Sequence, residues 1–416
     1  MAVNRKKKVD TKFLGINPWL DNSEQGLLLI ASLLARPDEE METAPGIDEM
    51  SAACGRLLSI ELESDFALIR QIIRLFTFPA RNRFLYNTAI AGFGGGFSSG
   101  KSSVLNSLLG NDSKFKLPIS SSPTTSISTY IMQGKEEKAI ACATSGREMI
   151  LDPDALEAIS HQFREKHGIS LAQYIEFVGL SLPQFPCRGV SLLDTPGYNK
   201  ADTATMQEHH DKMRSQNALR SADHLVWIID AQQPLLTNDD ARFINELELS
   251  GEITVILNKC DMYGDIYEYP DPDLSDRVQS VKKSLEDQNV PYTAVIPYSA
   301  AVPEWNNGRA KIISFLEKVA DGKKSGQERV VQLNEIIYKI MNTFKTQLDD
   351  YHKDEIAKID AYIDASINPL ELGTLVQTRG LFGFERASLA NDYKIFATAA
   401  DILQKWIQRK MEAASA

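Results

Sequence analysis

The chain has 416 residues, 43% of them hydrophobic, and carries a formal net charge of −11 at pH 7. This length predicts two or three domains with hydrophobic cores, and the negative balance argues against a dominant nucleic-acid-binding surface. The four cysteines lack metal-like spacing, and the sequence has neither a signal peptide nor an apolar run of about 18 residues, so we expect a cytoplasmic protein with reduced thiols and no membrane span.

The first 80 residues contain two stretches with helical periodicity. Residues 23–35 begin with a capping serine and are rich in leucine. Residues 48–76 carry an apolar stripe at helical spacing, formed by Leu58, Leu62, Phe66, Ile69, Ile73 and Phe76. Ahead of both, the basic cluster at 5–8 predicts either a solvated tail or a contact with anionic lipid.

A glycine- and serine-rich loop follows the apolar strand expected at 84–93. Residues 95–103 match the pattern G-x-x-x-x-G-K-S, in which backbone N–H groups and the positive end of the next helix bind phosphate oxygens. In such a loop Lys101 reaches the β- and γ-phosphates, and the Ser102 hydroxyl ligates Mg²⁺. The nucleotide-binding residues expected here are Gly95, Gly96, Phe97, Ser98, Ser99, Gly100, Lys101, Ser102 and Ser103.

A long segment separates this loop from the next motif. The stretches 126–132 and 138–143 predict a pair of strands, and 154–167 and 171–178 predict helices. These helices are more than a minimal P-loop domain needs, so we expect an insertion here.

The second motif, D-T-P-G, begins at Asp194 and follows the apolar strand at 189–193. After a P-loop, a carboxylate in this position holds the Mg²⁺ shell, and the N–H of Gly197 senses a γ-phosphate. By itself the tetrapeptide is also compatible with an ordinary turn, because proline and glycine are turn residues. Downstream, 225–229 predicts a buried strand, and 240–247 and 276–288 predict helices, which is the alternation of an α/β domain with a mostly parallel sheet.

Two further motifs follow the strands expected at 253–257 and 294–297. The first is N-K-C-D, a guanine-reading signature whose carboxylate accepts hydrogen bonds from N1–H and the 2-amino group of guanine. Adenine lacks both donors and would leave the carboxylate unpaired. The nucleotide-binding residues expected here are Asn258, Lys259, Asp261, Ser299 and Ala300. Four motifs in this order predict a GTP-binding domain over residues 81–322.

Residues 323–416 are expected to be helical. The stretches 327–363 and 385–413 carry apolar stripes at helical spacing, and Asn368, Pro369 and Gly373 break the chain between them. Such stripes need partners, so we expect a neck or stalk bundle that also takes in the helices of residues 1–80.

Residues 379–386, with the sequence RGLFGFER, predict a loop at the tip of this bundle. Exposed leucine and phenylalanine, flexible glycine and flanking arginine are typical of a paddle that enters a membrane interface. The alternative is an ordinary loop whose apolar side chains pack back into the bundle.

The P-loop and its surroundings resemble the dynamin superfamily, and in particular bacterial dynamin-like proteins. Ser98, two residues before the last glycine of the loop, and Ser103, after the Mg²⁺-binding serine, match that family's pattern. Residues 230–235, DAQQPL, resemble a segment of the bacterial members. The spacing of 93 residues between Lys101 and Asp194 is similar to that of dynamins and much longer than in Ras-like GTPases.

The resemblance also implies a mechanism and a partner. Residues 123–125 resemble the first switch of dynamins, which places Thr125 on Mg²⁺ and near the attacking water, and Ser98 would position a charge-compensating group or a monovalent cation. Residues 198–200 offer no glutamine to orient water, as in dynamins. The serines at 120–122 depart from the glycines that dynamins often have there. Two copies would dimerise across the nucleotide face.

The leading hypothesis is a dynamin-like GTPase that uses Mg²⁺ and couples dimerisation to movement of a helical stalk at a membrane. One alternative is a regulatory GTPase that acts on a protein or ribosome partner without membranes. Another is a non-catalytic GTP-binding module. The helical segment after the GTPase domain is shorter than a full dynamin stalk, so the sequence leaves assembly into polymers open.

Overall fold

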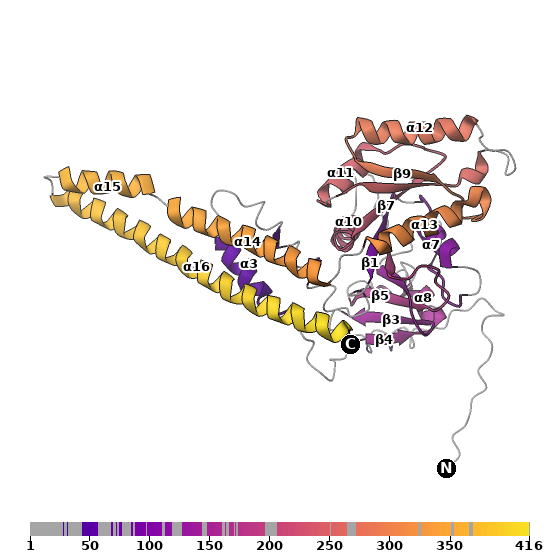
Figure 1. The fold of residues 1–416 in the computed structure, drawn as a ribbon, viewed down its shortest axis with the longest axis horizontal. Coiled ribbons are helices and arrows are strands. Elements are labelled where there is room, and N and C mark those ends of the chain that lie inside the picture. The colour runs from indigo at the N-terminus through magenta and orange to yellow at the C-terminus, as the bar shows by residue number, and fades with distance from the viewer. Residues whose placement is uncertain are drawn as a thin grey trace, which may run out of the picture. The chain divides into compact units, whose positions relative to one another are not determined.

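The computed structural model describes most of the chain from residue 44 onwards. The described residues are 28, 31, 44–56, 68–69, 72, 75–76, 85, 88–96, 98–109, 113–118, 127–143, 148–159, 163, 166–169, 171, 174–195, 206–249, 251–263, 272–322, 326–350, 353–365 and 369–415. From residue 44 on they form two compact units, one within 88–322 and one that combines 44–85 with 326–415 (Figure 1).

The first unit contains a nine-stranded sheet in the order β4-β3-β5-β2-β6-β1-β7-β8-β9. Its strands are β1 (Ala89–Gly94), β2 (Ser128–Gln133), β3 (Lys138–Ala143), β4 (Glu148–Leu151), β5 (Ile175–Leu182), β6 (Val190–Asp194), β7 (His224–Asp230), β8 (Ile253–Asn258) and β9 (Tyr292–Pro297). Five neighbouring pairs are parallel and three are antiparallel, which confirms the predicted mixed, mostly parallel sheet. Because β1 lies between β6 and β7 and is buried along its whole length, the loop that follows it emerges at the middle of the sheet.

The helices of this unit are α7 (Lys101–Leu109), α8 (Pro153–Ala158), α10 (Met206–Leu219), α11 (Asn238–Glu246), α12 (Pro272–Asp287) and α13 (Gly308–Asp321). At α11, Thr237 and Asp240 bind each other's backbone N–H groups in a capping box, which fixes where the helix begins. α11 and α12 confirm the helices expected in this part of the sequence, and α10 and α13 both contact β1.

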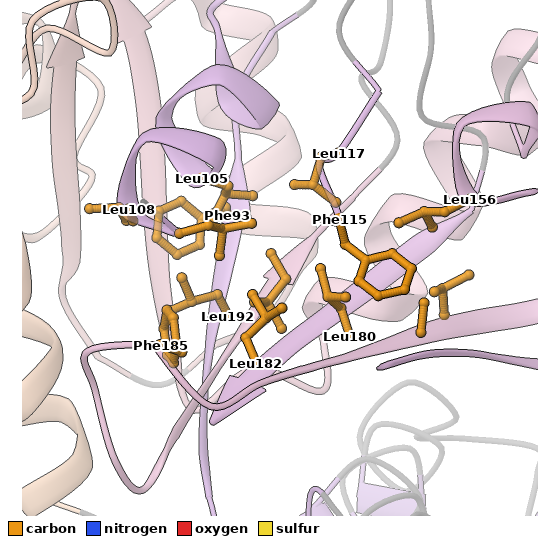
Figure 2. Close-up of a cluster of buried hydrophobic side chains, with 14 of the residues drawn as sticks. Phe93, Leu105, Leu108, Phe115, Leu117, Leu156, Leu180, Leu182, Phe185 and Leu192 are labelled. Atoms are coloured by element: carbon orange, nitrogen blue, oxygen red, sulfur yellow. The ribbon is translucent and has the colours of Figure 1, made fainter. Parts of the chain in front are cut away.

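One hydrophobic core joins α7 to the strands beneath it. Figure 2 shows Leu105 and Leu108 of α7 against Phe93 of β1, with Leu192 of β6 below them. All four side chains are fully buried, and burying a leucine or phenylalanine stabilises a fold by about 1.5–3 kcal/mol. This packing holds the first turn of α7, which carries Lys101 and Ser102 of the expected phosphate-binding loop, over the sheet.

The region between β2 and β6 differs from the sequence prediction. β2 and β3 are not paired with each other, because β5 lies between them, parallel to β2 and antiparallel to β3. The helix expected at 171–178 is wrong from Ile175 onwards, where β5 begins. A strand in the interior of a sheet is buried on both faces, so its near-continuous apolar run lacks the alternation that separates a strand from a buried helix. α8 ends at Ala158, and the rest of the helix expected at 154–167 is described only at isolated residues.

The second unit is helical and built from both ends of the chain. Its helices are α3 (Ile47–Arg56), α14 (Gly326–Asp350), α15 (Lys353–Ala365) and α16 (Pro369–Ser415), and α16 packs against each of the other three. Met50 of α3 is buried in one core with Phe344 of α14 and Phe396 of α16. At Gly46 a Cβ atom would come within 2.5 Å of the backbone oxygen of Ala399, so only glycine allows this close approach. The predicted packing of N-terminal on C-terminal helices is confirmed.

Two helix boundaries in this unit differ from the prediction. The helix expected at 327–363 is two helices, since α14 ends at Asp350 and α15 begins at Lys353. α16 is one helix that runs through residues 379–386, so the loop expected there is wrong (Figure 1). The break lies ahead of Pro369, because proline is well tolerated in the first turn of a helix, where its missing N–H costs no hydrogen bond.

The helix expected at 23–35 and the second half of the one expected at 48–76 fall largely outside the described residues. Within the part of the chain that the structure describes, every helix is too short or too polar to cross a membrane.

Candidate nucleotide-binding site

The phosphate-binding loop runs from the end of β1 to the start of α7. Its backbone adopts positive φ at Gly95 (148°), Ser98 (61°) and Gly100 (89°). At Gly95 a Cβ atom would lie 2.6 Å from the carbonyl oxygen of Ile228, and at Gly100 it would lie 2.3 Å from the amide nitrogen of Asn258. Both positions therefore require glycine, Gly95 because a backbone carbonyl lies close, Gly100 because the Asn258 side chain lies close, and both because of their backbone conformation.

Lys101 opens α7 and is folded back over this loop. Its ammonium donates hydrogen bonds to the carbonyl oxygens of Gly95 at 2.9 Å and Gly96 at 3.2 Å. Burial lowers the pKa of Lys101 to about 8, while the charges of Asp194 and Asp240 act in the opposite direction. A phosphate oxygen close to this buried cation would replace the weaker carbonyl partners and favour the charged form.

Ser102 and Asp194, the two expected Mg²⁺ ligands in the described residues, are brought together by the sheet. β1 and β6 are parallel neighbours, with Phe93 opposite Asp194, so β6 ends beside the start of α7. The Ser102 hydroxyl donates to a carboxylate oxygen of Asp194 at 3.1 Å, and the Asp194 side chain is fully buried. A hydroxyl and a carboxylate are oxygen donors that suit Mg²⁺, which commonly keeps several waters and substrate phosphates as its other ligands.

This modest donor set agrees with a second observation. The described residues hold no group of three or more His, Cys, Asp or Glu side chains that could enclose a metal ion.

The base-reading motif lies at the ends of β8 and β9, next to the phosphate loop. The Asn258 amide is buried, donates to the carbonyl oxygen of Ser99 at 3.1 Å, and accepts from the N–H of Ala300 at 3.1 Å. Asp261 accepts a hydrogen bond from the Ser299 hydroxyl at 2.6 Å and remains partly exposed. Asn258 thus ties the phosphate loop to the last of the four motifs, and Asp261 is held by Ser299 with its side chain still partly exposed.

Lys259 connects the phosphate loop to the end of β7. Its ammonium donates to the carbonyl oxygen of Ser98 at 3.1 Å and forms an ion pair with Asp230 at 2.6 Å. Sequence reasoning noted the segment that begins at Asp230 but did not include this carboxylate in the site. The position of Asp230 at the end of an apolar strand could have indicated it. β7 is the parallel neighbour of both β1 and β8, so its last residue lies at the same edge of the sheet as the phosphate loop and the guanine motif.

A further residue that sequence reasoning missed is Asn106, one turn after Ser102 on α7. Its side chain donates to the carbonyl oxygen of Leu117 at 2.9 Å and accepts from the N–H of Leu117 at 2.8 Å. Glu137, after β2, accepts hydrogen bonds from Ser113 and from the N–H of Lys114. The segment 113–118, which leads toward the expected first switch, is therefore fastened to the phosphate-binding helix.

Three of the expected site residues, Phe97, Thr125 and Gly197, lie outside the described residues. Ser103 is half-buried in the first turn of α7, and Ser98 is exposed on the loop. The ligand-binding and catalytic roles of these residues and of the other expected site residues stay predictions from the sequence.

A phosphate-binding loop that shares a sheet edge with a guanine-reading carboxylate is the arrangement of a P-loop GTPase. A match to a known protein family makes this assignment more specific than the class of P-loop GTPases. Residues 92–260 match the Dynamin family, from β1 through the phosphate loop to the guanine motif. Residues 92–260 therefore form a GTPase domain of the dynamin family.

Similar folds occur among solved structures. Two structures of an oligomerised bacterial dynamin pair, described as a mechanism for long-range sensing and tethering of membranes, share 15–16% identity with 85% of this chain at a TM-score of 0.46. The chain spans 52% of the length of those proteins. A variant of Aquifex aeolicus Era bound to GDP.AlF4⁻ shares 17% identity at a TM-score of 0.33, over 56% of each chain. No curated protein matches the sequence.

Proposed function

We propose that this chain hydrolyses GTP with Mg²⁺ and couples nucleotide-dependent pairing of two GTPase domains to movement of its helical unit at a membrane. In this proposal residues 81–322 are the GTPase domain, and residues 1–80 and 323–416 form the neck or stalk. The observation that carries the chemistry is the contact between Ser102 and Asp194 beside Lys101, at the same sheet edge as Asp261.

Phosphoryl transfer to water needs positioning and charge neutralisation more than covalent chemistry. Backbone N–H groups of the phosphate loop and the N-terminus of α7 would bind the phosphates, and Lys101 would supply a buried cation there. Ser102, Asp194 and Thr125 would hold Mg²⁺, which neutralises charge on the β- and γ-phosphates when bound. Asp261 would select guanine.

Water must be oriented without a glutamine, because residues 198–200 read Tyr-Asn-Lys. We assign this role to Thr125, and we assign charge compensation to Ser98, with a monovalent cation as its partner. Ser98 suits this role because its side chain is exposed and its backbone is held in the left-handed region by the contact with Lys259.

Pairing across the nucleotide face is supported by apolar side chains around the guanine site. Leu235, Met262 and Val302 are 55%, 58% and 36% exposed and lie on the loops that follow β7, β8 and β9. Consecutive parallel strands end at one edge of a sheet, so these three side chains belong to the same rim. An exposed apolar rim around a ligand site is suited to a second protein surface.

Contact with lipid is supported by a different surface. Leu381 and Phe384 on α16 are 64% and 74% exposed, and Arg379 and Arg386 flank them on the same helix. Apolar side chains beside basic ones on one helix are suited to an anionic membrane interface.

The GTPase rate as a function of protein concentration tests the proposal. A rate per molecule that rises with concentration supports pairing, because each site would gain groups from a second copy. A flat, slow rate at all concentrations would favour a switch that acts on another partner, and binding without turnover would favour a non-catalytic module.

A further inference from the structure

The carboxylate of Asp230, at the end of β7, contacts both the loop that follows this strand and the lysine of the next motif. One oxygen of Asp230 accepts the N–H of Gln232 at 2.8 Å, which closes the turn, and the other accepts the ammonium of Lys259 at 2.6 Å. The Asp230 and Lys259 side chains are 22% and 34% exposed, so solvent screens this ion pair only in part. One side chain therefore shapes its own loop and holds the lysine of the neighbouring motif.

The backbone of Lys259 has an uncommon conformation that other contacts must stabilise. Its backbone has φ of 67°, and the residue that accepts its second hydrogen bond, Ser98, has φ of 61°. Neither residue is a glycine, and side chains are uncommon in this left-handed region unless other contacts hold them there. The ammonium of Lys259 bridges the two loops by binding the Ser98 carbonyl on one side and Asp230 on the other.

The loop after β7 is itself anchored on the base-reading loop. The N–H of Ala231 donates to the carbonyl oxygen of Asn258 at 2.8 Å, and the carbonyl oxygen of Ala231 accepts from Arg277 at 2.7 Å. The guanidinium of Arg277 also lies over the ring of Tyr263, with its carbon 3.5 Å from the ring centroid. These contacts make the Asp230 loop a rigid lateral support for residues 258–263.

We propose that Asp230 is a positioning residue for guanine nucleotides, which acts by holding Lys259 between the base-reading loop and the phosphate loop before nucleotide arrives. The inference rests on the proposed guanine-nucleotide site. A loop that is already ordered before binding gives a tighter complex, because binding then loses less conformational entropy. The support joins loops that GDP and GTP would contact alike, so Asp230 contributes equally to GDP and GTP affinity.

The test uses Asp230→Asn in the full chain, with fluorescent mant-GDP and mant-GTP as probes. The asparagine oxygen can still accept the Gln232 N–H. The NH₂ group that replaces the other carboxylate oxygen cannot accept a hydrogen bond from the Lys259 ammonium, so the variant removes the Lys259 contact alone. We expect both dissociation constants to rise by the same factor, about 3–10-fold, which is the effect of one partly screened charge-assisted hydrogen bond. Asp239→Asn, which removes a carboxylate from an exposed pair with Arg242, is the matched control and should bind like wild type.

A double-mutant cycle separates positioning from a general effect on the fold. In a Lys259→Ala background Asp230→Asn should change affinity by less than about 2-fold, because its partner is gone. An equal loss in both backgrounds, or unchanged affinity in the single variant, would overturn the role of Asp230 while leaving the guanine site intact. If wild type bound neither probe, the proposed function itself would be wrong, and this inference with it.

Discussion

Replacing Asn258 by alanine tests how the site is assembled. The side chain is 1% exposed and makes two hydrogen bonds, to the carbonyl oxygen of Ser99 and from the N–H of Ala300. Alanine removes both bonds and leaves two backbone groups without this partner, each at a cost of about 1–2 kcal/mol. The free energy of unfolding of the GTPase unit should therefore fall by about 2–4 kcal/mol, which lowers Tm by about 4–16 °C for a unit of this size.

The measurement is thermal unfolding of the nucleotide-free protein, with the GTPase transition identified by its shift when GDP is added. Asn245→Ala is the matched control, because this exposed asparagine lies on α11, away from the three loops. It should unfold within about 1 °C of wild type, since exposed substitutions change stability little. GTP binding by Asn258→Ala should also weaken, because the phosphate loop and the base-reading loop lose their shared anchor.

If Asn258→Ala unfolded at the wild-type temperature, the amide would contribute nothing to holding these loops together. Loss of stability with unchanged nucleotide affinity would show that Asn258 matters for the fold alone. Either outcome would contradict the argument that this residue joins the two halves of the site.

Asp261→Asn should weaken GTP binding and improve xanthosine triphosphate binding, because an amide pairs with the oxygen that xanthine carries in place of the 2-amino group; competition binding measures both. Burial lowers the pKa of Lys101 from its ordinary value of 10.5 to about 8 in the folded protein. The unfolded state therefore binds more protons between these values, so wild type should gain stability relative to Lys101→Met as pH rises from 8 to 10.5, measured by denaturant unfolding. Leu381→Asp with Phe384→Asp should lower co-sedimentation with anionic liposomes at least about 10-fold, since each buried side chain contributes about 1.5–3 kcal/mol.

Each of these has a control or a contradicting result. Wild type that bound ATP as tightly as GTP would refute the guanine assignment of Asp261. A wild-type stability that fell relative to Lys101→Met across the same pH range would contradict the buried, depressed pKa. Val331→Asp, at a 56% exposed position on α14, controls for the liposome experiment. Equal loss of liposome binding in that control would show that any exposed apolar residue of the helical unit has the same effect.

The sequence by itself determined the elements whose signal is local. The phosphate loop, Asp194, and the pair Asn258 and Asp261 each follow an apolar strand directly, so their motifs also predict their place at the ends of parallel strands. The helical character of the C-terminal segment was equally readable, because apolar residues at steps of three and four must face a partner.

The tertiary structure alone decided which strands are neighbours and which polar groups meet. β5 lies between β2 and β3, where burial on both faces of the sheet suits its apolar run. The spacing of apolar residues cannot distinguish such a strand from a buried helix. α16 continues through residues 379–386 despite its glycines, since packing of one helix face on α3, α14 and α15 outweighs their weak helix propensity. The contacts of Asp230 with Lys259 and of Asn106 with Leu117 were not readable either, because such bonds depend on distances that exist only after the sheet has formed.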